Sequence, residues 1–309
     1  RGGMTSGAFP DLFARYCERA TRALSGFATA CTINELNVPL LIRDMVSAGI
    51  KGPNGTALRE AAEAALGGPI ESTFLFTPGA DLLTNGIAAH RKARDAIKSV
   101  RPEVQVGVTL SIQDEQAEPG AEAVRDARLD EIVNPFLDAV AGDDFIGVQT
   151  YTRMVAKADG TAGPAAGHPT TMMGYEDRPQ ALAEVCRYVW NRTRTPILVT
   201  ENGWAGSDDR RRAAFVRESL SALHGAIEDG VDVRGFFYWS LLDNFEWVAG
   251  YAPRFGIIAV DRTTQRRAIK PSALALGHIA QTNAVEPDNT PATFDGEASQ
   301  LSGAPLGIN

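Results

Sequence analysis

The chain has 309 residues, of which 44% are hydrophobic and 22% charged, the composition of a globular protein with one sizeable core. Its formal net charge of −8 at pH 7, with no basic stripe, argues against nucleic acid or an anionic membrane surface as a partner. The sequence also lacks the run of about 18 apolar residues that a membrane-spanning helix needs.

Hydrophobic periodicity predicts alternating strands and helices, the pattern of a parallel α/β sheet or barrel. In chain order, the expected helices are residues 10–24, 58–66, 80–99, 129–140, 179–190, 208–228 and 272–281. The expected strands are residues 28–33, 104–112, 145–151, 196–200 and 235–239. The apolar stripe of the first helix is Phe13, Cys17, Ala20 and Leu24.

Five βα units are three fewer than a closed (β/α)₈ barrel contains. We therefore predict an α/β fold of the TIM-barrel type that is incomplete, with residues 1–285 forming a partial barrel catalytic domain. Residues 286–309 are rich in Pro, Gly, Ser, Thr and Asp, which predicts a loose C-terminal arm.

The three cysteines, Cys17, Cys31 and Cys186, show no CxxC spacing and lie in apolar surroundings, which favours buried free thiols in a reducing compartment. No signal peptide is visible, and we expect a cytoplasmic protein, although the chain starts at Arg1 and the true amino terminus need not be shown.

Two carboxylates follow short β-type runs, in the motifs T-I-N-E at residues 32–35 and T-E-N-G at residues 200–203. Glycosidic bond cleavage requires such a pair, because one carboxyl protonates the leaving oxygen while the other attacks or stabilises an oxocarbenium-like carbon. Each motif alone is more typical of a helix cap or a loop salt bridge. The interpretation as a glycosidase therefore depends on a third segment.

That segment is residues 236–247, F-F-Y-W-S-L-L-D-N-F-E-W, an aromatic strand that runs into a loop. Indole rings provide stacking surface for the apolar faces of sugars, and a carboxylate accepts hydrogen bonds from two hydroxyls at once. Phe236 and Tyr238 share one strand face, where core packing is expected instead. All three motifs fall at the carboxyl ends of predicted strands, where (β/α)₈ enzymes place their active sites.

Together these motifs resemble glycoside hydrolase family one, the β-glucosidase family, whose members carry T-x-N-E-P, E-N-G and W-S-L-x-D-N-F-E-W motifs. The resemblance runs from Gly2 to about Thr282 and includes residues 151–153, 173–176 and 254–257. It implies a barrel enzyme that retains anomeric configuration through a covalent glycosyl-enzyme, with no cofactor or metal.

The resemblance implies that Glu35 is the general acid and base, that Asn34 contacts the sugar 2-hydroxyl and that Glu201 is the nucleophile. It implies that Tyr151 places its hydroxyl against the nucleophile. The implied glycone-site residues are Trp239, Glu246, Trp247 and, close to them, Phe255. Because a carboxylate at Glu246 would repel phosphate, a neutral β-glucoside, β-galactoside or β-fucoside is the expected substrate.

The sequence departs from the family pattern in three places. Leu36 replaces the usual Pro after the acid/base, and Gln149 replaces an Asn, for which we expect a retained hydrogen bond. The family's first three strands have no counterpart here, which would leave open sheet edges. These edges would be covered by the rest of a longer polypeptide, by self-association or a complementing segment, or by the C-terminal arm.

The alternative function is a catalytically inactive, carbohydrate-binding barrel remnant, for which the aromatic loop would serve equally well. Glu35 and Glu201 separate the two hypotheses, since a pure binder needs neither. Trp204 is a candidate for the aglycone entrance, and Asp243 and Asn244 are expected to brace their loop through local side chain to backbone bonds. The scattered His90, His168, His224 and His278 are interpreted as surface or packing residues.

Overall fold

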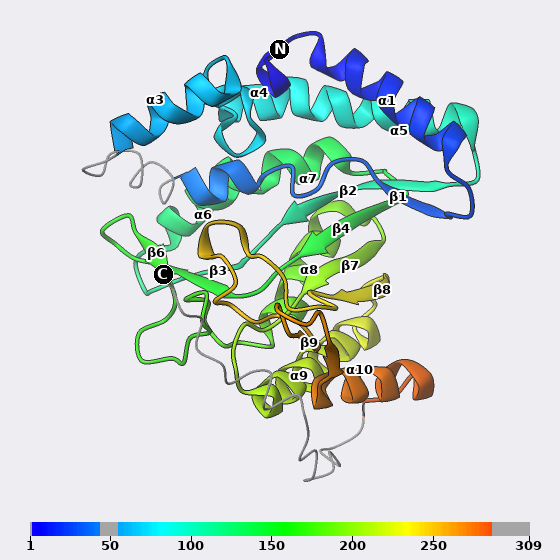
Figure 1. Ribbon diagram of the computed structural model, residues 1–309. Coiled ribbons are helices and arrows are strands. Elements are labelled where there is room, and N and C mark those ends of the chain that lie inside the picture. Colours follow the sequence, from blue (N-terminus) through cyan, green and yellow to red (C-terminus); the bar gives the residue numbers. More distant parts are fainter. Residues whose placement is uncertain (1, 44–54, 286–309) are drawn as a thin grey trace. The chain divides into compact units, whose positions relative to one another are not determined.

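The computed structural model describes residues 2–43 and 55–285 (Figure 1). Within them the chain forms two compact units. The first unit consists of the described parts of Arg1–Ile112, together with Arg125–Gln149 and Tyr188–Leu198. The second unit consists of Gln113–Val124, Thr150–Arg187 and the described part of Val199–Asn309. The predicted arm at residues 286–309 lies outside the described residues, and the single-domain assignment of residues 1–285 stays a prediction.

All five predicted strands are present and form a single sheet in the order β1-β2-β4-β7-β8. Their bounds are β1 Thr29–Cys31, β2 Gln105–Ser111, β4 Phe145–Gln149, β7 Ile197–Asn202 and β8 Val233–Tyr238. In the first unit, β1 pairs with β2 and β2 with β4, both in parallel. The strand β7 begins in the first unit and ends in the second.

The central strands are buried on both faces, as expected for a parallel sheet covered by helices. Every residue of β4 is buried, and so is every residue of β2 after Gln105. The two strands approach each other closely at their glycines, where an added Cβ on Gly107 would lie 2.3 Å from the carbonyl oxygen of Phe145. Only glycine fits this position without moving the backbone.

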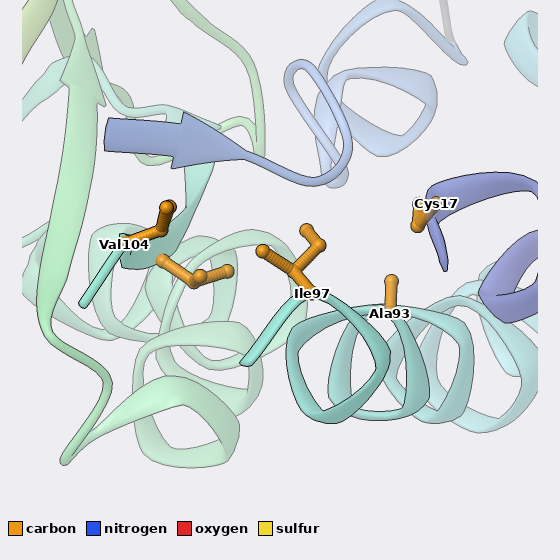
Figure 2. Packing of buried hydrophobic residues seen from close by; sticks show 5 residues of the cluster. Cys17, Ala93, Ile97 and Val104 are labelled. Atoms are coloured by element: carbon orange, nitrogen blue, oxygen red, sulfur yellow. The ribbon is translucent and has the colours of Figure 1, made fainter. Parts of the chain in front are cut away.

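In the first unit, helix α1 (Phe9–Ala23) lies alongside helix α5 (Ile87–Val100) (Figure 1). Figure 2 shows Cys17 of α1 facing Ala93 and Ile97 of α5, in a cluster that extends to Val104 and Val106 at β2. The predicted stripe of α1 is wrong at Leu24, which is 61% exposed. Leu24 lies beyond the last helical residue in extended conformation, so it leaves the stripe that faces α5.

Two predicted helices are interrupted. The prediction for residues 80–99 covers a short helix α4 (Gly79–Asp81), a π-helical segment η4 (Leu82–Gly86) and α5. The prediction for residues 129–140 covers the end of α6 (Glu122–Ile132) and all of α7 (Asn134–Val140). Pro135 separates these two because proline lacks the N–H that a continuing helix would need, whereas it fits a first helical turn.

The remaining helices match their predictions to within a few residues. They are α3 (Gly55–Leu66), α8 (Ala181–Thr193), α9 (Asp209–Glu228) and α10 (Pro271–Thr282). The start of α9 is capped by the side chain of Asp208, which accepts hydrogen bonds from the backbone N–H groups of Arg210 and Arg211. Residues 38–43 are also helical.

Short elements were not predicted. In the second unit, β3 (Asp114–Ala117) pairs with β5 (Arg153–Ala156), which pairs with β6 (Ala162–Gly163), and β9 (Ile258–Val260) pairs with β10 (Arg267–Ile269). The single turns η1 (Gly3–Thr5), η2 (Ile70–Ser72), η3 (Phe74–Phe76) and η5 (Trp247–Ala249) were also missed. Elements of two to four residues are too short to show a hydrophobic period.

Among the cysteines, Cys17 and Cys186 are buried as predicted, but the prediction for Cys31 is wrong because this residue is exposed. Cys31 ends β1, which is the first strand in the sheet order and pairs only with β2 in that order. No helix in the described ranges, residues 2–43 and 55–285, combines the length and hydropathy needed to cross a membrane.

Candidate active site

Glu35 lies in a turn just after β1 in the first unit. Its φ angle of 49° is in the left-handed region, which non-glycine residues seldom adopt. Two hydrogen bonds hold the turn against β2: the Glu35 backbone N–H donates to Thr109 Oγ1 over 2.8 Å, and the Leu36 N–H donates to the Thr109 carbonyl over 3.1 Å. The end of β2 thus sets the position of Glu35.

The environment of Glu35 favours its protonated form. Burial raises the pKa of this carboxyl, and a side-chain hydrogen bond with Ser111 lowers it by less, so the pKa lies above its ordinary value. A carboxyl with a raised pKa keeps its proton at a higher pH than an exposed glutamate does, which suits a proton donor.

Asn34 is exposed, and its side-chain oxygen is held by two donors of the first unit. Asn34 Oδ1 accepts hydrogen bonds from Thr109 Oγ1 over 3.1 Å and from Gln149 Nε2 over 2.9 Å. The expected hydrogen bonding by Gln149 is therefore confirmed. The roles of Thr109 and Ser111 were not predicted, although two hydroxyl residues two positions apart on an otherwise apolar strand were a signal for them.

Glu201 is half-buried near the end of β7, and its carboxylate is fixed within the second unit. The Tyr151 hydroxyl donates a hydrogen bond to Glu201 Oε2 over 2.5 Å. Such a short, charge-assisted bond stabilises the negative charge of the carboxylate and restricts its orientation. The predicted contact between the Tyr151 hydroxyl and Glu201 is thus present.

Two further aromatic rings hold Tyr151 in place. The Phe255 ring meets it edge-on, with 5.7 Å between ring centroids, and the Tyr175 ring lies 5.9 Å away at an interplanar angle of 39°. Phe255 is only 3% exposed, so its ring is placed to support Tyr151 more than to present a surface. Tyr175 was not predicted as a site residue, because nothing local in its sequence indicates this contact.

The aromatic loop after β8 brings Trp239 and Glu246 together. Trp239 Nε1 donates to Glu246 Oε1 over 3.3 Å. Burial raises the pKa of Glu246, and the Trp239 bond lowers it by less. Trp247 is 77% exposed and presents an open indole surface. The peptide bond between Trp239 and Ser240 is cis.

Asp243 braces this loop, as predicted, but through partners that are distant in sequence. Asp243 Oδ1 accepts from the Gly256 N–H over 2.9 Å, and Lys270 Nζ donates to its two oxygens over 3.0 and 2.9 Å. Lys270 also donates to the Gly256 carbonyl over 2.7 Å. The local hydrogen bonding expected for Asp243 is therefore wrong, because its partners are Gly256, just before β9, and Lys270, which lies between β10 and α10.

The family model described as Glycosyl hydrolase family 1 matches residues 141–285. The crystal structure of beta-glycosidase BGL167 is 38% identical, with a TM-score of 0.84 over 94% of this chain and 71% of that chain. The chain belongs to glycosyl hydrolase family 1.

A curated relative of this family 1 chain is a "Beta-galactosidase" from Sulfolobus acidocaldarius, 34% identical over 65% of this chain and 48% of the relative. A beta-glucosidase structure from Thermotoga maritima, 21% identical, has a TM-score of 0.73 over 92% of this chain and 70% of that one, and this likeness concerns the fold. The family 1 chain thus spans about half the length of the curated relatives it matches.

These matches confirm the predicted fold class for the family 1 chain. The fold is α/β of the TIM-barrel type, and the five-stranded sheet supplies five of the eight strands of a closed barrel within the described residues. Of the residues predicted for the site, Asn34 and Glu35 lie in the first unit and the other six in the second.

One other interpretation of the family 1 sequence needs correction. Trp204 does not line an entrance: it is 8% exposed and its Nε1 donates to Asp177 Oδ2 over 3.0 Å. The interpretation of His90 as a packing residue is confirmed, because it is fully buried, and both of its ring nitrogens are also hydrogen-bonded. In the part of the chain that the structure describes, no His, Cys, Asp and Glu side chains cluster as a metal site would require.

Proposed function

We propose that this chain carries the catalytic residues of a retaining β-glycosidase. The observation that carries the proposal is the contrast between its two motif carboxyls. Burial raises the pKa of Glu35, whereas Glu201 accepts a 2.5 Å hydrogen bond from Tyr151 that favours its charged form. Two carboxyls in such opposed environments match the acid and the nucleophile of glycoside hydrolysis.

In the proposed mechanism, Glu201 attacks the anomeric carbon while Glu35 gives its proton to the leaving oxygen, so the glycosidic bond breaks and a glycosyl ester forms. Glu35, now ionised, removes a proton from water as the water oxygen attacks the same carbon. The ester bond then breaks, which returns Glu201 to its ionised form. A retaining reaction of this kind needs the two carboxyls about 5–5.5 Å apart.

We propose neutral β-glycosides as substrates. Glu246 and Trp239 form a hydrogen-bonded pair on the loop after β8, and an ionised Glu246 would repel a phosphorylated sugar while accepting bonds from neutral hydroxyls. Relatives described as beta-galactosidase and beta-glucosidase support the class of neutral β-glycosides without choosing between the two sugars. Trp247, which is 77% exposed, would provide stacking surface.

The test is to trap the glycosyl-enzyme on the 309-residue chain. The protein is incubated with a 2-deoxy-2-fluoro-β-glucosyl donor carrying a dinitrophenyl leaving group, and peptides are then analysed by mass spectrometry. The expected result is one glycosyl adduct on the peptide containing Glu201, absent in Glu201→Gln. The absence of an adduct in a folded chain that still binds glucose-derived inhibitors would support the carbohydrate-binding alternative instead.

A further inference from the structure

A chain of polar side chains, buried at its centre, links the turn that carries Glu35 to helix α5 within the first unit. Thr32 Oγ1 and His90 Nδ1 are 2.7 Å apart, and His90 Nε2 lies 2.7 Å from Asp143 Oδ2. Arg94 completes the chain by donating from NH1 to Asp143 Oδ1 over 2.6 Å. The side chains of His90 and Asp143 are 0% and 1% exposed.

The direction of these bonds follows from what each group can donate. Asp143 as a carboxylate only accepts, so the His90 Nε2 atom carries the hydrogen that bonds it. His90 Nδ1 is then bonded to the Thr32 hydroxyl, which also lies 3.4 Å from the Gly107 carbonyl of β2. Both ring nitrogens are occupied, so the imidazole has a defined orientation between α5 and β1.

Three elements meet through this chain. Thr32 follows β1, His90 lies in the first turn of α5, and Asp143 lies between α7 and β4. Thr32 is only three residues before Glu35, whose own backbone is bonded to Thr109 of β2. The turn carrying Glu35 is thus held from β2 on one side and from α5 on the other.

We propose that His90 is a positioning residue for Glu35, acting through Thr32, with Asp143 orienting its ring. The inference rests on the proposed function for its catalytic consequence. Glu35 adopts a left-handed backbone conformation, which persists only where surrounding contacts impose it. Removing the Thr32 bond releases one of those contacts, and the turn relaxes.

The structure suggests a variant pair that isolates this bond. Thr32→Val keeps the shape of the side chain but removes the hydroxyl, whereas Thr32→Ser keeps the hydroxyl. Ile97→Val is the matched control, because Ile97 lies in the buried face of the same helix and belongs to the cluster around Cys17. His90→Gln is a second variant. We expect its amide to donate to Asp143, as His90 Nε2 does, while Thr32 loses the ring nitrogen Nδ1 as its partner.

The assay compares two aryl β-glucosides. Phenolate needs a proton to leave, whereas 2,4-dinitrophenolate leaves without one, so misplacement of the acid slows only the phenyl substrate. We expect Thr32→Val to lower kcat/KM for phenyl β-glucoside by about 100-fold, the scale of an ångström-sized misplacement. For the dinitrophenyl substrate we expect kcat/KM to fall by less than about threefold, because proton donation contributes little to the departure of dinitrophenolate.

A second readout is independent of turnover. Hydrogen exchange of the Glu35 and Leu36 amides, both bonded to Thr109, should be faster in Thr32→Val and His90→Gln but unchanged in Thr32→Ser and Ile97→Val. If the wild-type chain hydrolyses neither substrate, the proposed function fails and exchange alone decides whether His90 positions the turn. Equal losses on both substrates together with unchanged exchange would overturn the inference, as would identical behaviour of Thr32→Val and Ile97→Val.

Discussion

Glu176→Gln should destabilise the chain strongly, because Glu176 is a fully buried carboxylate that accepts three hydrogen bonds. Arg153 donates from Nε to Oε2 over 3.2 Å and from NH2 to Oε1 over 2.5 Å, and the Ala165 N–H donates to Oε2 over 2.8 Å. A glutamine amide keeps one oxygen acceptor but turns an NH2 group toward the donors on its other side. Arg153 would then lack its buried counter-charge.

The size of the expected loss of stability follows from this geometry. Removing one partner of a buried ion pair costs about 3–5 kcal/mol. Arg153 keeps a second acceptor in Gln116, at 3.1 Å, and its side chain is 12% exposed. We therefore expect a loss in free energy of unfolding at the lower end of this range, about 3 kcal/mol. The measurement is urea unfolding at pH 7, with the exposed Glu228→Gln as the matched control.

The same carboxylate predicts a pH dependence. Burial by itself would raise the pKa of Glu176, but the Arg153 and Ala165 hydrogen bonds and the charges of Arg153 and His168 outweigh it and lower the pKa. A lowered folded pKa contributes stability that is complete above the unfolded value of about 4.3 and is lost as the pH falls toward the folded value. Glu176→Gln should therefore lose less stability than wild type on acidification below that value. A variant that unfolds at the wild-type urea concentration would refute the reasoning.

Three further predictions concern the proposed site. Tyr151→Phe removes the donor to Glu201 and should lower kcat/KM by about 30-fold, the equivalent of about 2 kcal/mol, while the melting temperature changes little because the ring contacts remain. Since burial raises the pKa of Glu35, kcat/KM for phenyl β-glucoside should fall as the pH rises through that raised value, and this limb should vanish in Glu35→Gln assayed with the dinitrophenyl substrate. Lys270→Met leaves Asp243 with an unpaired buried charge and should cost about 3 kcal/mol in urea unfolding, and a loss below about 1 kcal/mol would contradict the bracing role.

The expected association at an open sheet edge is tested by light scattering. β1 and β8 are the end strands of the sheet order, and we expect a concentration-dependent dimer if a second copy pairs with either. Substituting the exposed Phe237 of β8 with Lys should then shift the equilibrium toward monomer. A monomer at every concentration would exclude self-association as the means of covering these edges.

The five strands could be predicted because a strand that is buried on both faces appears in the sequence as a run of mostly apolar residues. Residues 104–112 and 145–151 are mostly apolar, since parallel strands covered on both faces bury nearly all of their side chains, and their few polar residues lie mainly toward the ends that form the candidate site. Sequence reasoning failed at β3, whose residues D-E-Q-A carry no hydrophobic alternation and pair with β5 far along the chain. It also placed Leu24 in the core, because periodicity does not show where a helix stops.

The sequence by itself determined the candidate site residues: two carboxyls and an aromatic loop at strand ends, which depend only on residue type and local pattern. Only the tertiary structure decided the environments of these groups. The Thr109 bond to the Glu35 turn, the Tyr151 bond to Glu201 and the Lys270 bond to Asp243 each join residues at least 27 positions apart. Such partners are brought together by the packing of helices on a sheet, and that packing depends on contacts that no local window of sequence contains.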